Sequence, residues 1–134
     1  MTKIIIAYFA TMIVFFAIDF VWLGTVAKNF YQGQIGPLLL EDFRIGVAAA
    51  FYIVYLAGVT FFAARPALES GTATTALLYG AAFGFFCYAT YDFTNLATLK
   101  GYTVMVALVD LAWGTFLTGI SAYLGTWITL KFTA

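Results

Sequence analysis

Long apolar blocks dominate this sequence, and most of its charged residues lie between the blocks. A helix needs about 20 mainly apolar residues to cross the hydrocarbon core of a bilayer, and each block is roughly that long. The pattern therefore predicts an all-α integral membrane bundle that forms a single domain over residues 1–134. We expect its four transmembrane helices at about residues 4–27, 45–64, 73–96 and 103–124.

The only long connection is the segment between the first two blocks, residues 28–44. Pro37 can open a helical turn, and the leucines after it are followed by Glu41 and Asp42. This pattern favours a short interfacial segment lying on the membrane, although an irregular loop fits nearly as well. The first block exceeds the roughly 7–15 apolar residues of a signal peptide and contains Asp19, so we expect a retained helix.

Composition excludes several classes of function. Hydrophobic residues make up 64% of the chain and charged residues only 9%, whereas soluble domains carry roughly 25% charged residues. Six basic and six acidic residues give no net charge and no basic patch, which does not fit nucleic-acid binding. The lack of His and the single cysteine, Cys87, exclude a His-held haem, a His/Cys zinc site, a Ser-His-Asp triad and an intrachain disulfide. We expect no cofactor and no metal.

Four spans place both chain termini on one side of the membrane. The basic residues then divide evenly between the two sides, so the positive-inside rule does not decide the orientation. The tied sets are Lys3, Arg65 and Lys131 against Lys28, Arg44 and Lys100. The free N-terminal amine favours cytoplasmic termini.

Two carboxyl groups lie inside the apolar blocks, at Asp19 and Asp110. Each costs roughly 2.5–3.5 kcal/mol on insertion scales, so each needs a physical reason to be there. From the rise of a helix, both acids lie roughly 5 Å from the centre of their span. Both displacements point toward the side that carries Lys28 and Lys100. We therefore expect the two carboxyl groups at similar depth.

The third block becomes polar toward the same side. Tyr88, Tyr91, Asp92 and Asn95 are three or four residues apart and share a helix face. The pattern predicts an intramembrane pocket for ligand binding or proton handling, lined by Asp19, Asp92, Asn95 and Asp110. Supporting residues would be Trp22, Tyr88, Tyr91, Thr94 and Trp113.

Structural alternatives exist for each of these features. An intramembrane Asp can simply accept a hydrogen bond from a Trp or Tyr of a neighbouring helix and so hold the bundle together. Gly80 and Gly84 form a small-residue face that permits close helix contact. We favour packing within the chain for this face over a homo-oligomer contact.

Three motifs resemble domain-of-unknown-function family 2177. They are residues 19–24 (DFVWLG), followed by Tyr31 and by Leu38-Leu39, then residues 91–101 (YDFTNLATLKG) and residues 110–115 (DLAWGT). The likeness covers nearly the whole chain. It implies a four-helix protein of the bacterial inner membrane, in a family with no established reaction.

Three hypotheses about function remain. Carboxyl groups at one depth fit a small transporter or ligand-binding membrane protein in the lipid bilayer. The alternative is a membrane-embedded enzyme that uses one of these acids as general acid or base on a lipid-like substrate. The third is a structural accessory subunit. The other half of the membrane is notably apolar, which argues against a continuous pore through one chain.

Overall fold

A computed structural model describes residues 1–133, and this part of the chain is helical throughout its spans and contains no strand. The first span joins α1 (Thr2–Trp22), η1 (Leu23–Ala27), α2 (Lys28–Ile35) and η2 (Gly36–Leu38). The second joins α3 (Ile45–Val59), η3 (Thr60–Ala64) and α4 (Arg65–Ser70). The third and fourth are α5 (Ala73–Thr98) and α6 (Val104–Thr133). All four are long and apolar enough to cross a membrane, which confirms the predicted four-helix membrane bundle.

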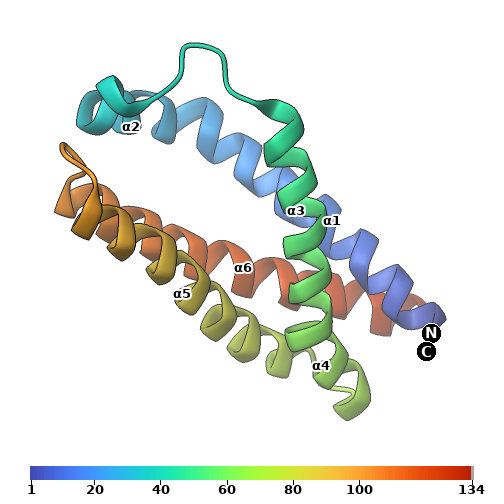
Figure 1. Cartoon of the computed structure of the whole chain (residues 1–134). Helices are drawn as coiled ribbons and strands as arrows, with labels where there is room; N and C mark the ends of the chain where they lie inside the picture. The colour runs from blue at the N-terminus through green and yellow to red at the C-terminus, as the bar shows by residue number, and fades with distance from the viewer. Residues whose placement is uncertain (134) are drawn as a thin grey trace.

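The first span runs further than the sequence suggested. Residues 28–35 were expected to leave the membrane helix, but they continue it as α2 after the π-helical turn η1. This stretch contains no proline before Pro37, and its single glycine, Gly33, is accommodated within α2. The non-helical connection therefore shrinks to residues 39–44, which arch from η2 to α3 (Figure 1).

The second span also passes its expected end. Pro66 lacks an N–H group and would normally stop a helix, yet the chain stays helical to Ser70. Residues Thr60–Ala64, which end two positions before Pro66, form the π-helical turn η3, whose wider turn shifts the hydrogen-bond register ahead of the proline. Gly71, with φ 72°, then ends α4 in the left-handed conformation that glycine adopts readily.

Small residues bring α5 and α6 into close antiparallel contact (Figure 1). A Cβ atom added to Gly84 would lie 2.7 Å from the carbonyl oxygen of Gly114, and one added to Gly80 would lie 2.9 Å from Cβ of Ala122. The face formed by Gly80 and Gly84 therefore packs within the chain. It is not free for the homo-oligomer contact that the sequence left as an alternative.

The remaining helices pack more loosely around this pair. α1 crosses α6 where Thr11 fills the space beside Gly125, and Phe15, Leu56 and Leu117 form a fully buried core. Many large apolar side chains point outward, and in a membrane these surfaces contact lipid. The chain is thus a multi-pass protein of a lipid bilayer, with both termini at the same end of the molecule (Figure 1).

We expect Gly84→Ala to lower the free energy of unfolding by about 1–3 kcal/mol, because the new methyl group meets the α6 backbone. Gly46→Ala is the matched control, since a Cβ there meets nothing within 4 Å. Titration with SDS in mixed micelles, followed by tryptophan fluorescence, measures both variants. Equal stability of the two would contradict the importance of the α5–α6 contact.

A carboxylate-lined cavity between the spans

A partly open cavity of about 720 Å³ lies between the four spans, in the half of the bundle that contains α2. Its charged lining residues are Asp19, Asp110 and Arg44. Six tyrosines also line it: Tyr31, Tyr52, Tyr55, Tyr88, Tyr91 and Tyr102. The rest of the wall is mainly apolar and includes Leu38, Leu39, Leu40, Phe43, Val47 and Phe51. The cavity therefore combines acidic groups with a hydrophobic wall.

Asp19 projects from α1 and is only 8% exposed. Its Oδ1 accepts a hydrogen bond of 3.2 Å from the indole Nε1 of Trp113 on α6. The ring of Trp113 stacks on that of Trp22, with centroids 4.3 Å apart and planes 11° from parallel. The stack fixes the indole, so its N–H stays directed at the carboxyl group of Asp19.

Asp110 projects from α6 toward the same cavity. Its Oδ1 accepts a hydrogen bond of 2.7 Å from the phenol of Tyr31 on α2. This bond links the cavity end of the first span to the last helix. Asp19 and Asp110 lie near enough to interact electrostatically, so the two carboxyl groups share one end of the cavity.

Asp92 lies behind this end of the cavity rather than in its wall. It is fully buried, and its Oδ1 accepts a hydrogen bond of 2.6 Å from the phenol of Tyr102. Its Oδ2 has no hydrogen-bond partner among residues 1–133, and its carboxyl group neighbours that of Asp110. Burial, and next the bond to Asp92, raise the pKa of Tyr102, which keeps its phenol protonated as a donor at neutral pH.

The predicted site residues fall into three groups. Those that line the cavity are Asp19, Asp110, Trp22, Trp113, Tyr88 and Tyr91. Asp92 and Asn95 do not line it; Asn95 lies beside Tyr91 and Tyr102. Thr94 points away, because it is exposed and its hydroxyl donates to backbone carbonyls of its own helix, at Thr90 and Tyr91. Thr94 therefore does not line the cavity, and its supporting role stays a prediction.

Sequence reasoning missed two donors and one cation. Tyr31 and Tyr102 lie in stretches that the sequence predicted to be connections, and Arg44 was counted only for orientation. A signal for Tyr31 existed, because a helix continued past residue 27 would place it two turns after Leu23, on the cavity side. Nothing in the sequence indicated that Tyr102 folds back onto Asp92.

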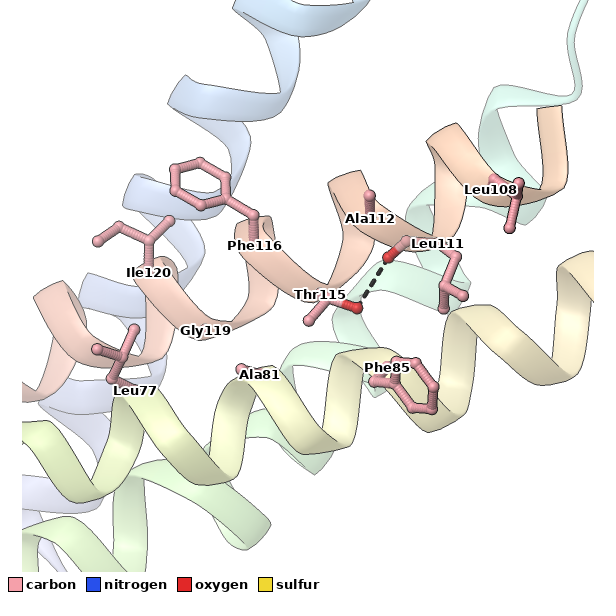
Figure 2. A pocket seen from close by; sticks show the side chains of 10 residues that line it. All are labelled: Leu77, Ala81, Phe85, Leu108, Leu111, Ala112, Thr115, Phe116, Gly119 and Ile120. Atoms are coloured by element: carbon pink, nitrogen blue, oxygen red, sulfur yellow. Dashed lines mark hydrogen bonds between the residues drawn. The ribbon is translucent and has the colours of Figure 1, made fainter. Parts of the chain in front are cut away.

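A second hollow lies on the outside of the α5–α6 pair and has a different chemistry. It measures about 580 Å³ and is lined almost wholly by apolar side chains, as Figure 2 shows. The hydroxyl of Thr115 is already bonded to the carbonyl of Leu111 at 2.8 Å. This groove offers no free polar group, so in a bilayer it suits acyl chains without further recognition.

The carboxyl groups of the inner cavity can accept more hydrogen bonds than they receive. An ionised carboxylate has about four acceptor sites, and Asp19 and Asp110 each receive one bond from an aromatic side chain. Within residues 1–133, no three Asp, Glu or Cys side chains are grouped closely enough to hold a metal ion. The arrangement is suited to accept hydrogen bonds from an organic ligand.

The fold and the cavity define a multi-pass membrane protein with an acidic interior. The family described as predicted membrane protein (DUF2177) matches residues 4–127, and the chain belongs to that family. No curated protein and no solved structure matches the chain.

We expect Tyr102→Phe to lower the free energy of unfolding by about 1–3 kcal/mol, since Asp92 then loses its donor while buried. Tyr79→Phe, on the exposed side of α5, should change it by less than about 0.5 kcal/mol. The same SDS titration measures both. A loss for Tyr102→Phe of only about 0.6 kcal/mol, the average for membrane hydrogen bonds, would mean that Asp92 finds another donor.

Proposed function

We propose that this protein binds a small cationic molecule inside the membrane, as a ligand-binding protein or small transporter. The observation that carries the proposal is the cavity of about 720 Å³ with Asp19 and Asp110 at one end. Both acids line this partly open cavity, and each receives only one hydrogen bond there, so acceptor capacity remains. A ligand that supplies donors there would use those sites.

Charge narrows the class of ligand. Two carboxyl groups, those of Asp19 and Asp110, line the cavity, and the carboxyl group of Asp92 neighbours Asp110 outside its wall. The only basic side chain that lines the cavity is Arg44, which is exposed at the start of α3. A primary ammonium group supplies both positive charge and three hydrogen-bond donors. A lipid-soluble primary amine is therefore the ligand class that we assign.

One end of the cavity is closed by packed side chains, and this determines whether a continuous path could cross the chain. Phe15, Leu56 and Leu117 are fully buried between the cavity and the end of the molecule that holds the termini. This packing supports a site that is open on one side, as expected of a binding protein or of one state of a transporter. It does not favour a continuous pore.

A membrane-embedded enzyme is the second candidate, and one observation favours it. Asp92 and Asp110 are neighbouring carboxyl groups, and Oδ2 of Asp92 has no partner among the described residues. Such a pair could pass a proton to or from a lipid-like substrate as general acid and base. Mass spectrometry of the amine and lipids after incubation tests this, because an enzyme would alter one of them.

We expect the protein to bind dodecylamine saturably in phosphatidylcholine nanodiscs. Trp22 and Trp113 line the cavity and report binding by fluorescence, and Trp127→Phe removes the remaining tryptophan. Asp110→Asn should weaken the apparent affinity by roughly 10- to 100-fold, the value of a lost charge-assisted hydrogen bond. Asp42→Asn is the matched control, because this acid is exposed in the connection before α3.

Two results would overturn the proposal: no saturable signal with dodecylamine, or equal affinity in Asp110→Asn and the unmodified chain. If every polar substitution destabilises the fold to the same extent and no amine binds, the acids are structural. Uptake of radiolabelled amine into proteoliposomes, lost in Asp110→Asn but kept in Asp42→Asn, separates a transporter from a binding protein.

A further inference from the structure

We propose that the ligand is a single-chain amphiphile that reaches the acids sideways, from the lipid, between the first half of α3 and the second half of α5. Its ammonium head would lie at Asp19 and Asp110, and its apolar tail would lie in this opening. The inference rests on the proposed function, and it adds where the tail of the ligand lies and how the ligand enters the cavity. The experiments below separate failure of the route from failure of the site.

The opening has identifiable boundaries. Its floor is the stacked pair of Tyr55 on α3 and Phe83 on α5, whose ring centroids are 5.6 Å apart. Above this pair α3 and α5 touch little, and no hydrogen bond joins them anywhere in residues 1–133. The lateral walls are Val47 from α3 and Tyr91 from α5, which line the cavity and are 68% and 59% exposed.

The opposite side of the cavity is closed. There the first span is tied to α6 by the bonds from Trp113 to Asp19 and from Tyr31 to Asp110. Farther along, Thr103 donates to the side chain of Gln34 at 2.9 Å. Residues 45–50, by contrast, are exposed at every position, and Figure 1 shows the start of α3 standing apart from α5. Of the two sides, the one between the first span and α6 is closed, and the one between α3 and α5 is open to lipid.

The walls of the opening match a hydrocarbon tail. Leu38, Leu40 and Phe43 line the cavity from the end of η2 and the connection before α3, and Val47 and Phe51 continue the apolar surface along α3. A compact water-soluble cation would gain nothing from this wall. An amphiphile uses both the acidic end and the apolar wall of the cavity. Its ammonium head donates hydrogen bonds to the carboxylates, and its tail stays among apolar side chains and lipid.

The outer groove on α5 and α6 provides an internal comparison. It has a similar volume, about 580 Å³ against about 720 Å³, and its wall is apolar throughout (Figure 2). It contains no acid that could hold a cationic head. A tail that binds for its hydrophobicity alone would therefore occupy both hollows, whereas an amphiphile held by its head occupies only the inner one.

The tail can be located with a dodecylamine derivative that carries a diazirine at the end of the chain. After photolysis in nanodiscs, we expect labelled peptides from residues 45–55 of α3 or 87–91 of α5. Excess dodecylamine should suppress this labelling, and Asp110→Asn should abolish it. Labelling of the outer groove at Leu108 or Phe116 should persist in both cases, because lipid-soluble tails reach it without specificity.

A matched pair of substitutions tests the opening itself. Ala48 lines the cavity, whereas Ala50 is exposed on the opposite face of the same helix and does not line it. We expect Ala48→Phe to weaken dodecylamine binding by at least about 10-fold through steric filling, and Ala50→Phe to leave it unchanged. Circular dichroism and SDS titration verify that both variants are folded.

The results of these experiments distinguish failure of the lateral route from failure of the binding site. If dodecylamine binds and depends on Asp110, but the tail labels other helices and Ala48→Phe has no effect, the lateral route is wrong and the site stands. If no amine binds in any variant, the proposed function fails and the route fails with it. Suppressible labelling on α3 or α5 together with loss of affinity in Ala48→Phe supports the inference.

Discussion

Three carboxyl groups must be supplied with hydrogen-bond donors inside a membrane, and the cavity half of this fold depends on that constraint. An acid at the centre of a span costs roughly 2.5–3.5 kcal/mol, and the hydrocarbon core offers no water to offset it. Each acid here takes its donor from an aromatic side chain of another segment. The pairs are Asp19 with Trp113, Asp110 with Tyr31 and Asp92 with Tyr102. These bonds hold the first and third spans, and the connection before α6, at fixed positions around α6.

The two halves of the molecule are held together by different physics. Toward the termini, glycines such as Gly84 let α5 and α6 approach until backbone meets side chain. Toward α2, the first span and the start of α3 stand farther from the α5–α6 pair, and polar bonds between the spans replace close packing (Figure 1). Lipid tails are as apolar as leucine, so a membrane supplies little hydrophobic force to close such a gap. A cavity beside α3 is therefore compatible with a stable bundle.

The acids were accessible to sequence reasoning because depth along a helix is a local property. Asp19 and Asp110 could be placed at one level from the rise per residue alone, and both line the cavity. The third acid shows the limit of such reasoning. Asp92 does not line the cavity, and the hydroxyl of Thr94 donates to the backbone of its own helix. Rotation of a helix about its axis depends on the packing of its neighbours, which spacing does not report.

The sequence by itself determined the number of spans, the membrane environment and the position of each acid along its span, because hydropathy and helical rise act within single segments. Tertiary structure alone decided which donor meets which acid and which side of the cavity is open. Tyr31 reaches Asp110 only because η1 and α2 carry the first helix past residue 27, across 79 positions of sequence separation. An opening remains beside α3 because α5 and α6 pack closely against each other, whereas residues 45–50 of α3, although mostly small, have no partner helix against them.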